Sequence, residues 1–342
     1  MHRKSDPYWV VLQSALILLV AAPLSSIGAA PTPALAPVQT EDPAFLDYAL
    51  RTERWLRRQA TVTKTGKIWR SKSEKDDHPV TNGNLYYGSA GVILFYLELY
   101  QQTGDPAFLQ EARDGAGYLI ATLPTELYIK RDLSFLEIFP SLNLPEGGEM
   151  PAFTAANGLG HPNQASLYWG VSGIGFALGE MYRVTGDESY RAAALRVVDL
   201  LLRDHHTDQH IDESGATWGS APEVMLGDAG VGLFLLYASR ELKHPGAEKL
   251  ARAIGNHALA SAKKSDGGLM WPTGRIYFGT DHPNFSHGTS GVGYFLAALY
   301  QHTGDERYLV GASSVGTYLV NIAHENGLIA HHLPDDGLVY YG

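Results

Sequence analysis

The chemistry open to this chain depends on histidine and carboxylate side chains, because its 342 residues include no cysteine. Disulfides and thiolate catalysis are therefore excluded, and His, Asp and Glu are the remaining strong metal ligands. One histidine, His287, directly precedes a Gly-x-x-Gly pair formed by Gly288 and Gly291. A histidine at the start of a helix can present its imidazole to a substrate as a general acid or base. The alternative is an imidazole satisfied by nearby backbone groups.

Three carboxylates lie close to such glycine pairs: Glu223, Asp228 and Asp281. Glu223 could orient His287 or bind a substrate amine, and its alternative is a solvated carboxylate stabilised by a helix dipole. A glycosidase would need two carboxylates facing each other across a cavity. The sequence alone pairs none of the three.

A second group of histidines lies six to eleven residues before the first glycine of a pair: His78, His161, His282, His331 and His332. If the loops that carry them open on one face, these imidazoles would surround one mouth and could bind a metal without cysteine. Three of them precede proline, so ordinary turns are the competing interpretation. Another set has ligand-like spacing but follows a helix end, which favours a solvated loop: His205, His206, Asp208, His210 and Asp212.

The elements that must position these residues belong to an internal repeat. The stretch 284–312 contains a Gly-x-x-Gly pair, an apolar run and a Thr-Gly-Asp turn that begins fifteen residues after the first glycine. The same layout starts at Gly88 and Gly170, and a copy at Gly227 keeps the glycines but not the turn. Self-similarity at this period is typical of repeat architectures.

Each unit is predicted to be a helical hairpin. In the last copy Val292, Phe295, Leu296 and Leu299 recur at spacings of three and four, as in a helix with one buried face. The glycine of the Thr-Gly-Asp turn can end that helix in the left-handed conformation. The following aspartate can cap the next helix, expected over 308–318. A glycine pair kept in four copies predicts close backbone approach at the helix start.

Three of the glycine pairs, and Gly342, are each preceded by a short extended piece with a repeated pattern, at 66–69, 215–218, 268–271 and 327–329. An outer helix is expected over 42–60, ahead of the first of them. Aromatic residues precede most glycine pairs, for which core packing and a stacking surface for sugars or peptide side chains are both open interpretations: Tyr86, Tyr87, Tyr168, Trp169, Phe285, Tyr340 and Tyr341.

The composition limits the partners. A net charge of −10 and a pI near 5.7 disfavour nucleic acid, because phosphate binding depends on clustered Lys and Arg. Residues 1–30 have a basic start, an apolar stretch and small residues near Ala29, which predicts a cleaved signal peptide and a secreted or periplasmic protein without a stable membrane span. An uncleaved anchor is the alternative. Residues 31–40 are Pro-rich and predicted to be a tether.

The glycine-pair hairpins, the Trp-bearing extended pieces and the segment 285–291 (FSHGTSG) resemble the lanthionine synthetase C-like (LanC-like) family. The resemblance covers 41–342, about four and a half units, and implies an all-α fold in which helical hairpins form an α/α toroid. Seven units close the ring in that family. The set here is incomplete, as expected for part of a longer reading frame or for units completed by another chain.

The resemblance also implies a chemistry. Cyclases of the family add a peptide thiol to a dehydrated Ser or Thr, with zinc lowering the pKa of the thiol and a histidine acting at the α-carbon. The matching histidine is His287, and Glu223 stands where the family has Asp. The first zinc cysteine corresponds to Tyr340, a family Arg corresponds to Asp336, and the remaining ligands fall beyond residue 342.

We therefore expect an exported all-α toroid domain over 41–342, with His287 and Glu223 as catalytic residues in peptide or thiol chemistry at the centre of the ring. Zinc is implied by the resemblance alone, and no metal ligand is assigned. The alternatives are a carbohydrate-active α/α toroid, such as a glycoside hydrolase or an epimerase, and a non-catalytic module that binds peptides or glycans.

Overall fold

The computed structural model describes residues 43–70, 83–127, 164–203, 215–218, 222–273 and 280–333. Several sequence predictions lie outside these ranges: the signal peptide, the tether, His78, His161, the set between His205 and Asp212, Asp336 and Tyr340. Within the described ranges, no helix is both long enough and apolar enough to cross a bilayer.

Four helical hairpins and one preceding helix make up the described helices, which confirms the expected all-α class. The first helix is α2 (Pro43–Gln59), and the hairpins are α4 (Ser89–Thr103) with α5 (Pro106–Thr122), α8 (Val171–Thr185) with α9 (Glu188–Arg203), α10 (Asp228–Arg240) with α11 (Ala247–Ser261), and α12 (Thr289–Thr303) with α13 (Glu306–Ile322). The expected helices over 42–60 and 308–318 correspond to α2 and α13, respectively. The helix α13 starts before residue 308 because Asp305 already caps it.

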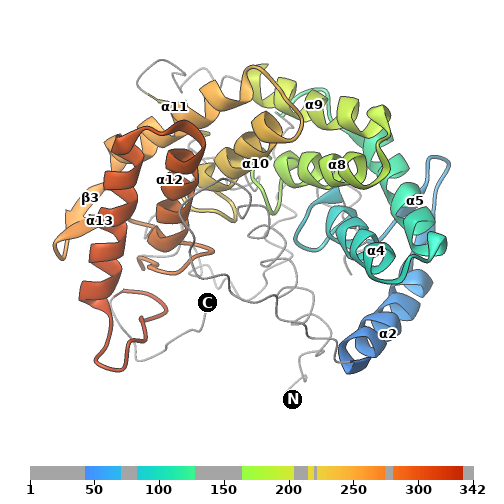
Figure 1. The fold of residues 1–342 in the computed structure, drawn as a ribbon, viewed down its shortest axis with the longest axis horizontal. Coiled ribbons are helices and arrows are strands. Elements are labelled where there is room, and N and C mark those ends of the chain that lie inside the picture. The colour runs from blue at the N-terminus through green and yellow to red at the C-terminus, as the bar shows by residue number, and fades with distance from the viewer. Residues whose placement is uncertain are drawn as a thin grey trace, which may run out of the picture.

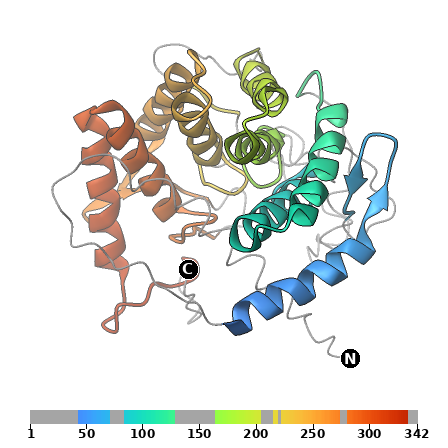
Figure 2. The ribbon, with the colours of Figure 1, turned by 45° about the vertical axis from the view of Figure 1, so that its right-hand side comes forward.

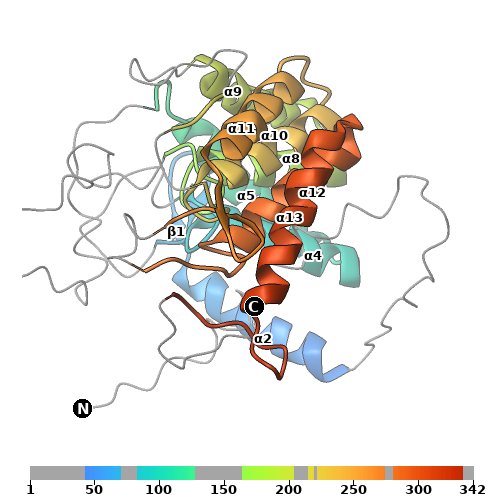
Figure 3. The same ribbon diagram turned by 90° about the vertical axis from the view of Figure 1, so that its left-hand side faces the viewer.

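The hairpins are arranged as two concentric rows in an arc, the architecture of an α/α toroid (Figure 1). The helices α4, α8, α10 and α12 form the inner row, and α5, α9, α11 and α13 form the outer row. Neighbouring inner helices pack against each other in chain order. Figure 2 shows α2 and α13 at the two ends of the arc, and from the end of the arc α13 lies in front of the other hairpins (Figure 3).

The turns between inner and outer helices form as their Thr-Gly-Asp sequences predict. Gly104, Gly186 and Gly304 end the inner helices at φ near +70°, the left-handed region that favours glycine. Asp105 and Asp305 then cap the outer helices by accepting hydrogen bonds from the backbone two residues later.

The second glycine of each pair allows the close backbone approach that the repeat predicts. A methyl group on Gly230 would lie 2.0 Å from the carbonyl oxygen of Val224, and one on Gly291 would lie 2.2 Å from that of Phe285. In these units the loop before the inner helix therefore folds back tightly against the first turn of that helix.

The Trp-bearing extended pieces attach the loops to the helices. Two of them form short antiparallel pairs, β1 (Thr61–Val62) with β2 (Lys67–Ile68) and β3 (Lys263–Ser265) with β4 (Gly268–Met270). Trp271 donates its ring N–H to the carbonyl of Ala258 at 2.8 Å, and its backbone N–H to Thr289 at 3.2 Å. Trp69 makes the equivalent bonds in the first unit.

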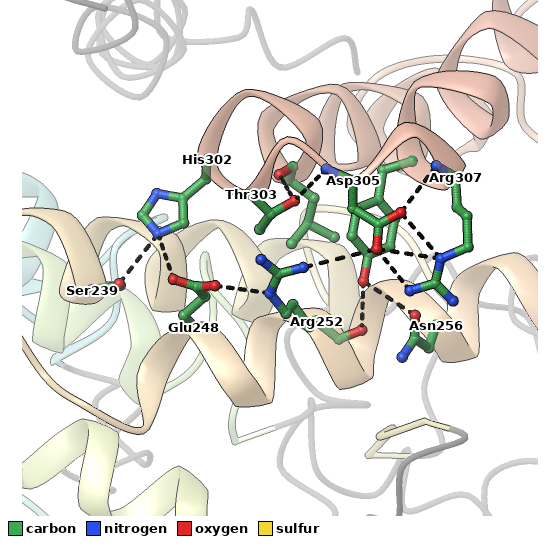
Figure 4. Close-up of polar contacts among 10 residues, drawn as sticks. Ser239, Glu248, Arg252, Asn256, His302, Thr303, Asp305 and Arg307 are labelled. Atoms are coloured by element: carbon green, nitrogen blue, oxygen red, sulfur yellow. Dashed lines mark hydrogen bonds and ion pairs between the residues drawn. The ribbon is translucent and has the colours of Figure 1, made fainter.

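Polar side chains tie the last two hairpins together at the surface (Figure 4). Glu248 on α11 contacts His302 of α12 at 3.4 Å and accepts a hydrogen bond from Arg252 at 2.8 Å. The hydroxyl of Tyr308 donates to Asn256 at 3.1 Å. Exposed contacts of this kind contribute little individually, and the buried apolar residues of both rows form the core that fixes the arc.

Candidate active site

The loops before the inner helices form a continuous rim. We use this name for the four equivalent segments, each ending at the residue before its glycine: 84–87, 166–169, 223–226 and 284–287. A chain of backbone hydrogen bonds joins them, from Tyr86 N–H to the carbonyl of Tyr168 (2.9 Å), from Tyr168 to Met225 (3.2 Å) and from Met225 to Ser286 (3.1 Å). These hydrogen bonds therefore fix the position of each rim segment relative to the next.

The first residue of three rim segments caps the turn within its own segment. Asn84 accepts a hydrogen bond from the backbone of Tyr87 (3.0 Å), and Asn284 accepts one from the backbone of His287 (2.9 Å). Glu223 accepts two, from Met225 (2.7 Å) and Leu226 (2.6 Å). These caps fix the last residue of each segment, which is His287 in the fourth unit.

The structure places Glu223 and His287 in contact. The Oε2 atom of Glu223 lies 3.5 Å from Nδ1 of His287, the Glu223 side chain is fully buried, and the imidazole is 30% exposed. The Met225–Ser286 backbone bond of the rim brings the two segments together at this point. Glu223 is therefore not the solvated carboxylate that was the alternative interpretation.

This contact determines which nitrogen of His287 could act on a substrate. A carboxylate that faces Nδ1 favours the tautomer with its proton on Nδ1, because that N–H can then donate to the carboxylate. The other nitrogen, Nε2, is then an acceptor able to take a proton. A carboxylate oriented by two backbone N–H groups cannot turn away when the imidazole becomes charged. This arrangement is the one that general acid–base catalysis by histidine needs.

Three of the histidines expected near one mouth do come together, and His287 joins them. The ring of His282 lies 5.2 Å from that of His331, 6.0 Å from that of His332 and 6.4 Å from that of His287, measured between centroids. His282 is only 8% exposed. Burial, followed by the charges of the neighbouring imidazoles, lowers the pKa of His282 from 6.5 to about 4.

The two remaining carboxylates accept hydrogen bonds from residues of neighbouring loops. Asp228 is buried and accepts hydrogen bonds from the Thr217 hydroxyl and from the backbone of Trp218 (3.1 Å). Asp281 accepts one from the backbone of Thr273 at 2.7 Å. Because Glu223 also accepts from backbone N–H groups, each of the three carboxylates already holds a hydrogen bond from the backbone of a neighbouring loop or turn.

Aromatic residues of the first two rim segments form a cluster. The ring of Trp169 lies 6.1 Å from that of Tyr86 and 5.7 Å from that of Tyr87, and the two tyrosines are 6.0 Å apart. Trp169 is buried, whereas Tyr86 and Tyr87 are half-buried. Core packing therefore accounts for the tryptophan, and the tyrosines retain surface that a ligand could contact.

The LanC-like resemblance places Tyr340 at the first zinc-ligand position and the other ligands beyond residue 342, so the described ranges do not include that site. Within the described ranges, no group of three or more His, Asp or Glu side chains has the arrangement of a metal site. The chemistry considered below is that of the described side chains.

Sequence reasoning missed Asn284, which caps the turn carrying His287. A signal was present, because Asn84 and Asn284 both stand four residues before the first glycine of their pairs. The hydroxyl of Thr273, which accepts a hydrogen bond from the backbone of His282 at 2.8 Å, had no counterpart in the repeat pattern. It could not have been found that way.

The comparisons with known proteins agree with this picture at the level of family resemblance and fold. Residues 192–336 match the family of lanthionine synthetase C-like proteins, so the expected resemblance is confirmed over the segment that contains Glu223, His282 and His287. No match was found among curated proteins.

Solved structures with similar folds share little sequence with this chain. Cellobiose 2-epimerase from Bacillus thermoamylovorans B4167 has a TM-score of 0.50 at 14% identity, over 87% of this chain and 76% of that one. Nisin cyclase has a TM-score of 0.49 at 15% identity, over 85% of this chain and 62% of that one. Unsaturated glucuronyl hydrolase from Bacillus sp. GL1 has a TM-score of 0.45 at 18% identity, over 87% and 72%. At these identities the likeness concerns the fold alone.

Proposed function

We propose that this chain, LanC-like over residues 192–336, is an acid–base enzyme in which His287 moves a proton at a substrate carbon next to a carbonyl group. The observation that carries the proposal is the contact between His287 and the buried, doubly hydrogen-bonded Glu223. A peptide is the substrate class we favour, because the family resemblance is strongest in the segment that holds this pair.

The reaction we propose is addition of a peptide thiol to a dehydrated Ser or Thr residue. His287 Nε2 takes the proton from the S–H group, and the sulfur forms a bond to the β-carbon. The electron pair of the C=C bond moves to the α-carbon as an enolate, and the imidazolium returns its proton there. One S–H and one C=C π bond are lost, one C–S and one C–H bond are formed, and His287 ends as it began.

Glu223 supports both halves of this sequence. A carboxylate that faces Nδ1 favours the neutral tautomer in which Nε2 is the acceptor, and its negative charge stabilises the imidazolium that forms afterwards. A hydrogen bond to a charged group contributes about 1.5–3 kcal/mol. An interaction that becomes stronger when the imidazole is charged stabilises the transition state more than the bound substrate, and therefore raises the rate.

A second candidate is proton transfer on a sugar, favoured by the half-buried Tyr86 and Tyr87 on the same rim, because aromatic rings stack on the apolar faces of sugars. An epimerase that acts at the carbon beside an aldehyde must remove and return a proton there. The same imidazole of His287 would perform that step. The glycosidase reaction is disfavoured, since it needs a free carboxylate pair.

The test is a cyclisation assay on a synthetic peptide that contains one cysteine and one dehydroalanine. Addition does not change the mass, so remaining thiols are labelled with iodoacetamide and the unlabelled fraction is followed by mass spectrometry. Wild type, His287→Asn and Glu223→Gln are compared with a control variant, Gln164→Ala. Gln164 lies two residues before the second rim segment. Cellobiose in D2O, followed by NMR at the C2 position, tests the sugar candidate in parallel.

The proposal predicts thiol loss above the spontaneous rate for wild type and Gln164→Ala, and a fall of about 10²–10⁴-fold for His287→Asn. If deuterium exchange at C2 of cellobiose is the only reaction observed, and it is lost in His287→Asn, the acid–base role of His287 would act on a sugar substrate instead of a peptide. Activity that survives His287→Asn, or the absence of both reactions together with tight peptide or glycan binding, would overturn the proposal in favour of a binding module. Export is also proposed, from residues 1–30, and N-terminal sequencing of the mature protein checks it.

A further inference from the structure

Two equivalent asparagines of the rim have different surroundings. Asn84 and Asn284 each cap the turn of their segment through Oδ1. Asn84 is fully buried, and among the described residues its Nδ2 atom has no hydrogen-bond partner. In the fourth unit, Nδ2 of Asn284 faces Nδ1 of His282 at 3.5 Å. The fold therefore tolerates an asparagine cap without a second contact, and the extra contact occurs in the unit that carries His287.

His282 is held from several directions. Its backbone N–H donates to the Thr273 hydroxyl at 2.8 Å, and its carbonyl accepts from the backbone of Thr289 at 3.1 Å. Its ring nitrogen Nε2 lies 3.3 Å from the Thr280 hydroxyl. The backbone bond to Thr289 is not special to this unit, because Gln164 makes the same bond to Val171 in the second unit at 2.7 Å. What is special is the side chain.

A second segment covers this ring. Residues 330–333 lie beside 280–282 through an antiparallel bridge, in which the backbones of Asp281 and Leu333 exchange hydrogen bonds of 3.0 and 2.7 Å. The bridge places His331 and His332 against His282. The imidazole is thus enclosed between the rim and the segment that follows α13.

We propose that His282 is a positioning residue for His287: its unprotonated Nδ1 accepts a hydrogen bond from Asn284, and this fixes the amide that caps the backbone of His287. The role rests on the proposed function of His287. It assigns to His282 no contact with substrate, since its ring is buried and lies 6.4 Å from that of His287.

The surroundings keep His282 in the state that this role requires. The titratable groups whose charges act on it are His331, His287 and His332, and all of them oppose its protonation. A hydrogen bond with the backbone of His331 works in the other direction. Burial is the largest effect, and together these lower the pKa of His282. An imidazole that stays neutral keeps a lone pair for Asn284, whereas a protonated ring would present an N–H to the Asn284 amide and force it to turn.

Two substitutions distinguish the hydrogen-bond acceptor of His282 from the bulk of its ring. His282→Leu keeps a side chain of similar size but removes the acceptor. His282→Asn places a carbonyl oxygen near the position of Nδ1 and loses the rest of the ring. Gln164→Ala is the matched control. The Gln164 carbonyl accepts a backbone hydrogen bond at the start of the second inner helix, as the His282 carbonyl does in the fourth unit, and Gln164 belongs to another rim region than Asn284 and His287. Each protein is checked for folding by circular dichroism and urea unfolding.

The readouts are the cyclisation kinetics and the 15N NMR signals of the His287 ring, which report its tautomer without any substrate. We expect His282→Leu to lower kcat about tenfold or more with little change in KM, because small displacements of a catalytic group have large effects. The proton of His287 should also lose its preference for Nδ1. His282→Asn and Gln164→Ala should keep wild-type values for both.

A purely structural role predicts a different result, in which His282→Leu and His282→Asn lose stability while the folded fraction keeps the wild-type tautomer and kcat. That result overturns the inference, as does a loss of function in His282→Asn equal to that in His282→Leu. If the leucine variant does not fold, His282→Met, which also lacks the acceptor, is measured in its place with the same expected result. Failure of the underlying function is distinguishable, because activity would then survive His287→Asn or be absent, whereas the NMR signals of the His287 ring still report the effect of His282.

Discussion

Replacing Glu223 by glutamine changes one atom of a buried side chain and tests its link to His287. The carboxylate accepts hydrogen bonds of 2.7 and 2.6 Å from two backbone N–H groups and faces Nδ1 of His287 at 3.5 Å. Oε2 serves both Met225 and His287, whereas Oε1 serves Leu226, so the NH2 group of Glu223→Gln must face either Leu226 or both of the others. If the amide oxygen takes the Oε1 position, the NH2 group opposes the Met225 N–H and the Nδ1–H tautomer of His287.

The expected size follows from the loss of one hydrogen bond to a charged group, about 1.5–3 kcal/mol. Because 1.4 kcal/mol corresponds to tenfold, kcat should fall about 10- to 150-fold if the loss is felt in the transition state. If the amide turns the other way, the contact with His287 is kept, the Leu226 N–H loses its acceptor, and the main effect is a fall in stability of about 1–3 kcal/mol. Either result should be visible in one set of measurements.

The assay combines cyclisation kinetics with urea unfolding, and Glu180→Gln is the matched control. Glu180 is also buried and accepts a hydrogen bond from the Tyr237 hydroxyl at 2.9 Å, between the inner helices α8 and α10. We expect Glu180→Gln to lower stability without a comparable loss in kcat per folded molecule. In the double variant Glu223→Gln/His287→Asn, the effects on kcat should be non-additive. Additive effects, or equal losses in both single carboxylate variants, would refute the coupling.

Three further predictions concern the scaffold. Gly230→Ala should lower the free energy of unfolding by more than about 2 kcal/mol, because its methyl group would lie 2.0 Å from a backbone oxygen. Gly316→Ala on α13 meets nothing within 4 Å and should raise it by up to about 1 kcal/mol. Urea unfolding of both variants checks this pair. Lowering the pH from 6.5 to 4 should reduce the free energy of unfolding by up to about 3 kcal/mol through His282. The reason is that the unfolded chain takes up a proton there, whereas His282 in the folded protein has a pKa of about 4 and stays mostly neutral. Unfolding curves in which His282→Asn keeps the full pH dependence of stability would contradict this. Thr289→Val should cost about 1 kcal/mol by removing the acceptor for the backbone of Trp271, and an unchanged urea midpoint would exclude that role.

The repeat could be predicted from sequence because each unit carries its own local signals. The glycines that end the inner helices, the aspartates that cap the outer ones and the glycine pairs each act within a few residues of their position. The structure confirms the turns at Gly104, Gly186 and Gly304 and the close approach at Gly230 and Gly291. Four copies of the same pattern then leave little choice but hairpins packed side by side.

The candidate site was only partly predictable, because its contacts join separate units. Glu223 and His287 were both selected from sequence, but the backbone bond from Met225 to Ser286 that brings their segments together leaves no mark on side-chain types. Likewise, the bridge between Asp281 and Leu333 places His331 and His332 on His282. Backbone pairing of this kind depends on the curvature of the whole arc, which no single unit specifies.

The proton that His287 is proposed to deliver can be followed directly. In D2O, wild-type protein acting on the peptide with cysteine and dehydroalanine should place one deuterium at the α-carbon of the new thioether, on one face only, as read by hydrolysis and chiral analysis of the product. His287→Asn should give only the slow spontaneous product, in which both faces carry deuterium equally. A His287→Asn variant that still forms the single stereoisomer at the wild-type rate would contradict the assignment of His287 as the acid–base group.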